Sequence, residues 1–236
     1  GGAGKSSATD EIVRRYLAGF PAQTIAVISV DPSKKKTGGA LLGDRIRMNA
    51  VAGPRVYMRS LATREDNTAI SKVAKEAIAI CKTAGYDAVI LETAGVGQSD
   101  ISIIDYCDVS IYVMTPEYGA ASQLEKINML DYADIIAINK FDKAGAEDAL
   151  SDVRKQYKRN HQLFTAGDDE LPVLGICANT FNDKRVNRFF ELLLRKVKAK
   201  TGVSWGAPSV NTSGDEQGIQ GAAVIPPRRM HYLSEI

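Results

Sequence analysis

The 236-residue sequence is poor in residues that bind transition metals, with three cysteines and two histidines. Cys81, Cys107 and Cys177 are far apart and stand in apolar surroundings, so we expect buried free thiols in a reducing, cytoplasmic setting rather than a disulfide or a metal cluster. His161 and His231 lack a nearby partner motif and therefore give no indication of metal binding.

The sequence also lacks an excess of charge and a long apolar run. Its 30 basic and 28 acidic residues leave a net charge of +2, which implies no polyanionic partner. The basic run 34–36 has no interleaved aromatic residues, so it indicates a solvated loop rather than a nucleic-acid patch. No apolar run approaches the ~20 residues that span a bilayer.

Apolar runs that fit buried strands alternate along the chain with amphipathic, helical segments. The expected strands cover 24–30, 56–60, 88–91, 109–113, 135–138 and 173–176, and the expected helices cover 6–17, 68–84, 144–164 and 183–200. This alternation predicts an α/β fold, with a mostly parallel sheet and helices on both faces. Ligands of such sheets lie beyond the C-terminal ends of the strands, so the polar residues that follow each strand are the candidates for chemistry.

The first seven residues, Gly1-Gly2-Ala3-Gly4-Lys5-Ser6-Ser7, match the second half of a phosphate-binding loop, G-x-x-x-x-G-K-[ST]. The glycines would let backbone N–H groups point at phosphate oxygens. Lys5 would reach the β- and γ-phosphates, and the Ser6 hydroxyl would ligate Mg²⁺. The alternative is a flexible Gly-Ala linker, because G-K-S alone is weak evidence.

A phosphate-binding loop normally follows a buried parallel strand, and the sequence contains neither that strand nor the first glycine of the loop. There is also no initiator Met. We therefore expect a segment of a longer polypeptide. Either residues outside this sequence supply the strand, or the sheet has a gap at its centre.

Asn139-Lys140-Phe141-Asp142 directly follows the expected strand 135–138. The Asp142 carboxylate could accept both N1–H and N2–H₂ of guanine, whereas adenine offers no such pair of donors. The Lys140 stem would pack on the loop and the purine, and Asn139 would tie the two loops together. The alternative is that N-K-x-D merely starts a helix after a strand.

Further polar residues follow other strands. Glu92 opens Glu92-Thr-Ala-Gly95, where GTPases commonly have D-x-x-G, whose carboxylate holds Mg²⁺. Asp31 and Asp44 also stand at plausible metal positions, although each could be a helix cap or a turn residue. Gln98 could orient a water, on weak evidence. Finally, Ala178 and Asn179 follow the last strand, where GTPases place a backbone N–H on guanine O6.

These motifs together resemble one family. Asp31-Pro-Ser, Thr37 to Arg45, Met48 and Glu92 to Ser99 are similar to the MeaB-type GTPases, metallochaperones of adenosylcobalamin-dependent acyl-CoA mutases within the SIMIBI class of P-loop proteins. The resemblance implies a GTPase domain over 1–202, without its first strand and the start of its P-loop, and a linker over 203–236. It places Mg²⁺ at Ser6, Asp31, Asp44 and Glu92, and guanine at Asn139, Lys140 and Asp142.

The tail from Val224 to Ile236 resembles the junction that leads into the mutase part of fused isobutyryl-CoA mutases. The resemblance implies Mg²⁺-dependent hydrolysis of GTP to GDP, coupled to loading, protection or removal of cobalamin at an acyl-CoA mutase. Adenosylcobalamin would then be bound outside this segment, and the GTPase would form a homodimer. Two alternatives are a GTPase that delivers another metal such as nickel, and a regulatory module that binds GDP or GTP without hydrolysis.

The segment Pro116 to Ile127 follows the expected strand 109–113 and resembles the third switch of this family. Residues 123–130 should be helical, with Leu124, Ile127 and Leu130 on the buried side and with Gln123 and Lys126 on one exposed face. A solvated face is the default interpretation of that pair. The alternative is that they reach a phosphoryl site in an assembled state, with Lys126 as an arginine-finger-like cation and Gln123 positioning water or its partner lysine.

Overall fold

The computed structural model describes residues 2–32, 48–63, 67–93, 104–118, 124, 127–180, 182–206 and 208, with side chains left undescribed at 31, 32, 62, 63 and 67–72. The strands are β1 (Ile25–Pro32), β2 (Val56–Thr63), β3 (Ala88–Thr93), β4 (Ile111–Met114), β5 (Ile135–Asn139) and β6 (Val173–Ile176). The helices are α1 (Lys5–Gly19), α3 (Asn67–Thr83), α5 (Met129–Tyr132), α6 (Ala146–Asn160) and α7 (Lys184–Thr201). Short 3₁₀ turns are η1 (Ile104–Tyr106), η2 (Pro116–Tyr118) and η3 (Asp168–Glu170).

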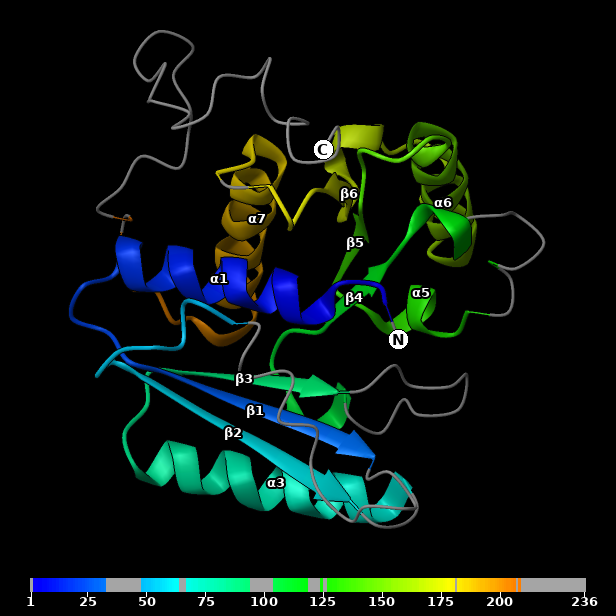
Figure 1. Cartoon of the computed structure of the whole chain (residues 1–236). Helices are drawn as coiled ribbons and strands as arrows, with labels where there is room; N and C mark the ends of the chain where they lie inside the picture. Colours follow the sequence, from blue (N-terminus) through cyan, green and yellow to red (C-terminus); the bar gives the residue numbers. More distant parts are fainter. Residues whose placement is uncertain are drawn as a thin grey trace, which may run out of the picture.

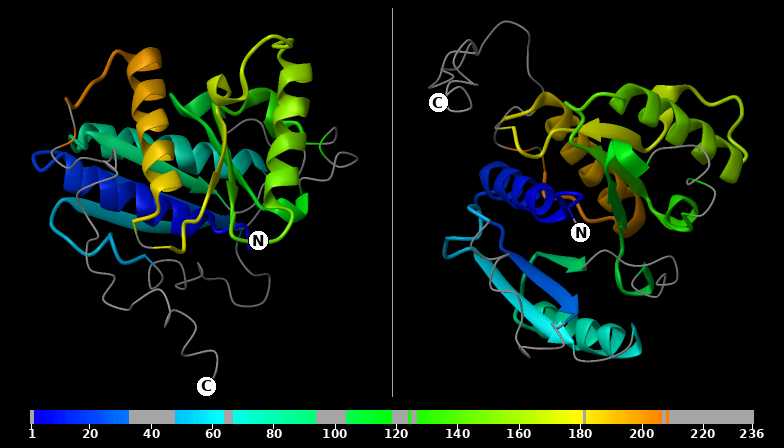
Figure 2. Two further views of the ribbon diagram at one scale, coloured as in Figure 1. Left: turned by 90° about the horizontal axis from the view of Figure 1, so that it is seen from above. Right: turned by 45° about the vertical axis from the view of Figure 1, so that its right-hand side comes forward.

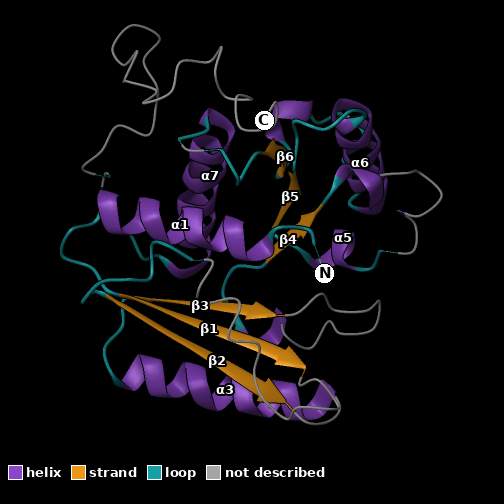
Figure 3. Ribbon diagram, in the orientation of Figure 1, coloured by secondary structure: helices purple, strands orange, loops and turns teal. Residues whose placement is uncertain are grey.

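The described strands form two parallel three-stranded sheets, in the orders β2-β1-β3 and β4-β5-β6 (Figure 1). Helix α3 lies against one face of the first sheet, and α1 runs between the two sheets (Figure 2). Helices α6 and α7 flank the second sheet on opposite sides (Figure 3). The predicted α/β class, with parallel strands and helices on both faces, is confirmed.

Alternating side chains of the central strands explain this layering, because successive residues of a strand point to opposite faces. In β1, Ala26, Ile28 and Val30 pack in the cluster of α3, whereas Ile25 and Val27 join the cluster of α1 and α7. In β5, alternate residues divide in the same way between α6 and the α1–α7 cluster. Helix α1 therefore shares one core with both sheets, which fixes its N-terminus relative to the ends of β3 and β5.

The facing edges of the two sheets, β3 and β4, are not hydrogen-bonded to each other. A cavity of about 670 Å³ separates them, lined by residues 87–93 on one side and 108–114 on the other, and by Ala3 and Lys5. Most β3 and β4 side chains are accordingly half-buried, whereas every residue of β5 and β6 is buried. Among the described strands none lies between β3 and β4, and both expectations, a strand supplied by residues outside this sequence and a gap in the sheet, stay open.

Several predicted boundaries are wrong, among them the ends of β1, β2 and β3, which run to Pro32, Thr63 and Thr93 rather than to 30, 60 and 91. Strand β4 begins at Ile111 rather than at 109, because the Ser110 N–H donates to Asp134 Oδ2 at 2.9 Å instead of to a neighbouring strand. Helix α6 ends at Asn160, just before the left-handed turn at Gln162 (φ 56°), rather than at 164. The expected helix over 123–130 is interrupted: Leu124 is helical, but Ile127 and Asn128 are not, and α5 begins only at Met129.

The burial predicted for this segment is confirmed for Leu124 and Leu130, whereas Ile127 is only half-buried against the cluster of α6. Cys81 and Cys177 are buried free thiols, as expected, but Cys107 is only half-buried, so the prediction is wrong for its burial. None of the helices in the described ranges combines the length and the apolar composition that a membrane crossing requires.

Candidate nucleotide-binding site

The N-terminal loop has the backbone of an anion-binding turn. Gly2 and Gly4 adopt left-handed φ angles of 92° and 79°, which residues with a side chain rarely adopt. Gly4 caps α1 without a side-chain hydrogen bond, and the first turn of the helix contains no acidic residue. The N-terminal amides and the positive end of the dipole therefore face outward beside the half-buried Lys5, an arrangement that favours a phosphate group.

Asn139 joins this loop to the two loops that follow β5 and β6. Its Nδ2 donates to the Ala3 carbonyl at 2.9 Å, and its Oδ1 accepts from the Ala178 N–H at 3.0 Å. The predicted role of Asn139 in tying the loops together is confirmed. Gly4 permits this approach, because a Cβ at Gly4 would lie 2.3 Å from Asn139 Nδ2.

The next residues form a tight turn with one buried anchor. Lys140 has a φ of 60° and is half-buried, Phe141 is buried, and Asp142 is exposed beyond them. Burial raises the pKa of the Cys177 thiol, which stays protonated and lies 3.9 Å from Asp142 Oδ1 as a weak donor. The turn thus presents the Lys140 and Asp142 side chains at the C-terminal end of β5, where the sequence predicted them.

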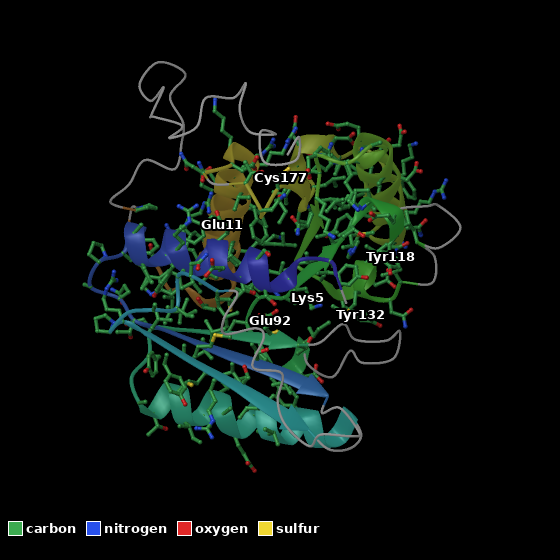
Figure 4. The ribbon with its side chains drawn as sticks, viewed as in Figure 1. Lys5, Glu11, Glu92, Tyr118, Tyr132 and Cys177 are labelled. Carbon is green, nitrogen blue, oxygen red and sulfur yellow. The ribbon has the colours of Figure 1, made fainter. Side chains whose placement is uncertain are left out.

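Ser6 and Glu92 meet across 86 residues of sequence. The Ser6 hydroxyl donates to Glu92 Oε1 at 2.6 Å, and Glu92 is 7% exposed near the end of β3 (Figure 4). A hydroxyl and a carboxylate are hard oxygen ligands of the kind that Mg²⁺ prefers, so these two residues fit that ion. Within the described ranges, no three His, Cys, Asp or Glu residues cluster as a ready metal site.

The other predicted site residues are not all described. Asp31 lies one residue beyond Val30, which pairs with Thr93, so its backbone is at the same end of the sheet as Glu92. The Asp31 side chain lies outside the described part, as do Gly1, Asp44, Gln98, Gln123 and Lys126. Ser7 and Asn179 are exposed at the rim of the loops.

Sequence reasoning missed a contact between the turn after β4 and the loop at the end of β5, residues 139–145. We call the latter the guanine loop, after the ligand that its N-K-x-D motif predicts. Glu117, in the turn after β4, forms a hydrogen-bonded ion pair with Lys143, one residue after Asp142. The hydrogen bond from Lys143 is the main cause that lowers the pKa of Glu117 to about 2. No motif marks either residue, and only the topology that brings the ends of β4 and β5 together reveals the pair.

Comparison with known proteins gives one family. Residues 1–223 match the family described as "Methylmalonyl Co-A mutase-associated GTPase MeaB". A "Fused isobutyryl-CoA mutase" of Geobacillus kaustophilus is 53% identical over 236 residues, covering 100% of this chain and 22% of the relative. This chain spans about a fifth of the length of the fused isobutyryl-CoA mutases that it matches.

Two solved structures share the fold. The LAO/AO transport system kinase superimposes with a TM-score of 0.58 at 25% identity, covering 85% of this chain and 57% of the other. HypB from Helicobacter pylori, solved in complex with nickel, superimposes with a TM-score of 0.56 at 18% identity, covering 84% of both chains. At that identity the likeness to HypB shows a common fold and nothing about the ligand.

Proposed function

Because the chain belongs to the MeaB family of GTPases, we propose that its P-loop and N-K-x-D loop together hold one guanine nucleotide. The observation that carries this proposal is the double contact of Asn139, which places the phosphate-binding turn and the guanine loop at a fixed separation. Two loops that lie 136 residues apart in the sequence are thus arranged for the two ends of one molecule.

The roles follow from the chemistry of each group. The amides of residues 1–7 and Lys5 bind the phosphates, and Lys5 also stabilises the charge that develops on the transferred phosphoryl group. Asp142 accepts the two guanine donors, and the Lys140 stem covers the purine. Because the Ala178 N–H already donates to Asn139, the Asn179 N–H takes the guanine O6.

Ser6 and Glu92 would hold the Mg²⁺ of this site, and Asp31 and Asp44 would complete its set of carboxylates, directly or through water. The ion, when bound, neutralises charge on the β- and γ-phosphate oxygens. The residues of this chain position the metal ligands, because the hydrogen bond between Ser6 and Glu92 holds both side-chain oxygens near Lys5. Gln98 orients the attacking water.

The cycle of GTP binding and hydrolysis gates cobalamin loading, protection or removal at an adenosylcobalamin-dependent acyl-CoA mutase. The support is the family description together with the mutase names of the relatives that cover the whole chain. Residues 1–202 are the GTPase domain, and residues 203–236 are the linker toward the mutase. The cofactor itself is bound by the mutase part.

The GTPase domain works as a homodimer in the assembled protein. Gln123 and Lys126 then act at the nucleotide site of the second domain, where Lys126 places a cation on the developing negative charge. A group of this kind acts on the transition state, so Lys126→Ala should lower the mutase-stimulated rate far more than nucleotide affinity.

Two measurements test these proposals. Titration of GDP and ADP against the protein should show a strong preference for GDP, and equal affinities would overturn the guanine assignment. Single-turnover GTP hydrolysis, with and without the mutase and with and without Mg²⁺, should show a slow basal rate that depends on Mg²⁺ and responds to the mutase. A rate that the mutase leaves unchanged would overturn the coupling alone.

A further inference from the structure

Phe141, the residue between Lys140 and Asp142, anchors the guanine loop in the core. Its side chain is 7% exposed, whereas Lys140 is half-buried and residues 142–145 are exposed. Its N–H donates to the Ile176 carbonyl at 3.1 Å, which holds the loop to the end of β6. The ring packs in the apolar cluster between the second sheet and α6. The position of this ring therefore determines the position of the residues on either side of it.

The ring lies directly on the backbone of Gly175 in β6. A Cβ at Gly175 would meet three ring atoms of Phe141, at 2.2, 2.4 and 2.5 Å, distances that real Cβ atoms essentially never show. Gly175 is a regular strand residue that pairs with Ile138, and its φ is not left-handed. Alanine could adopt this backbone conformation without strain, so the requirement for glycine comes from the ring alone.

Arg185, in the first turn of α7, also contacts the ring. Its guanidinium carbon lies 4.9 Å from the centroid of Phe141, within the range of a cation–π contact. The Arg185 side chain is exposed, so the contact contributes little to the core itself. It links the start of α7 to the guanine loop.

We propose that Gly175, Phe141 and Arg185 form a ring clamp that positions Lys140 and Asp142 for guanine. Lys140 is held at a φ of 60°, a conformation that a lysine rarely adopts. Contacts of the neighbouring residues must therefore hold the backbone in place. A ring displaced from Gly175 shifts both flanking residues through the chain, and the bidentate contact of Asp142 tolerates little displacement. The ring clamp rests on the proposed guanine site, and its members are positioning residues that do not touch the nucleotide.

The main test is Gly175→Ala, with Gly53→Ala as its control. Both glycines have φ outside the left-handed region, but a Cβ at Gly53 meets nothing within 4 Å. Gly175→Ala should raise the Kd for GDP about tenfold or more and leave the weak binding of ADP unchanged, so that the preference for GDP falls. Gly53→Ala should keep the GDP affinity of the parent chain. Equal losses for GDP and ADP would indicate general damage and would overturn the proposal.

The double variant Gly175→Ala/Phe141→Leu measures the coupling between the two positions. Leucine is smaller than phenylalanine and leaves room for the new methyl group, so the double variant should bind GDP more tightly than Gly175→Ala alone. Failure of leucine to relieve the loss would overturn the proposal. Arg185→Ala, a surface change that leaves the core intact, should raise the Kd for GDP about two- to fivefold. Arg185→Lys should recover part of that loss, and an unchanged affinity in Arg185→Ala would remove Arg185 from the ring clamp.

The nucleotide preference of the unsubstituted chain distinguishes a failure of the proposed guanine site from a failure of the ring clamp. If it shows no preference for GDP over ADP, the proposed guanine site fails. If it prefers GDP and Gly175→Ala prefers it equally, the guanine site stands and the ring clamp fails.

Discussion

The two halves of the molecule differ in how completely they hold their parts of the site. One half, built on β4-β5-β6 and here called the guanine half, buries every residue of β5 and β6. Asn139 and Phe141 hold its guanine loop in place. The other half, built on β2-β1-β3 and here called the phosphate half, has one described contact between predicted metal ligands, Ser6 with Glu92. The edge strands of both halves, β3 and β4, border the same cavity. The comparison indicates that packing sets the position of the proposed guanine loop, whereas the position of the proposed phosphate-binding loop depends on α1, which bridges the halves.

The largest expected effect is on the free energy of unfolding, and it comes from filling the cavity between β3 and β4. An extension of about six Val and Ile residues, joined to Gly1 by the missing first glycine of the loop and one further residue, would run parallel to β3, because Ser6 lies at the C-terminal end of that strand. Ala3 lines the cavity, so the extension would enter it and pair with β3 and β4. Burying these side chains should raise the free energy of unfolding on the order of 3–5 kcal/mol after the ordering cost.

Denaturant titration of the two chains measures this gain. An extension of equal length made of Gly and Ser is the control, since it cannot fill the cavity with apolar groups. Equal midpoints for both extensions would show that the gap does not accept a strand.

The next effect concerns the guanine half. Asp142→Asn should weaken GDP binding by about 2–4 kcal/mol, because a charged bidentate acceptor becomes an amide that must also bury its N–H donors. Asp142 is exposed in the described structure, so the change should leave the stability of the fold nearly unaltered. Calorimetric titration of GDP against both proteins checks this, and an unchanged affinity would contradict the guanine assignment.

In the phosphate half, a substitution at the proposed metal site should change only the part of GDP binding that depends on Mg²⁺. Glu92→Gln keeps the shape of the side chain and its contact with Ser6 but removes the charge beside the proposed ion. We expect the Mg²⁺-dependent part of GDP binding to fall about tenfold, with little change in binding measured in EDTA. A loss of equal size in EDTA would assign Glu92 to the support of the loop rather than to the metal.

The sequence predicted the buried centre of the guanine half better than its edges, for physical reasons. Continuous apolar runs such as 135–138 have one stable solution, a doubly buried strand, and N-K-x-D follows directly from it. The start of β4 was wrong because Ser110 bonds to Asp134, a partner 24 residues away that no local pattern shows. The role of Gly175 was invisible for the same reason, since only the fold brings it beneath Phe141.

The smallest expected effect lies at the rim of the guanine half, in the pair of Glu117 and Lys143. The folded pKa of Glu117, lowered from 4.5 to about 2 by its hydrogen bond with Lys143, means that the stabilisation is present above about pH 4.5. It decreases as the pH falls from 4.5 toward 2, where Glu117 becomes protonated in the folded state. Both side chains are solvent-exposed, so the contribution to stability is small and screened by salt.

A site-resolved NMR titration of the Glu117 carboxyl therefore measures this pair better than a melting curve does. We expect an apparent pKa near 2 in the parent chain and a return toward 4.5 in Lys143→Ala. Lys155→Ala, which removes a similarly exposed lysine of the pair with Asp152, should leave the Glu117 titration unchanged. A pKa near 4.5 in the parent chain would show that the rim turn is not held by Lys143. The guanine loop would then be held in place by the buried contacts of Asn139 and Phe141 and not by the ion pair at its surface.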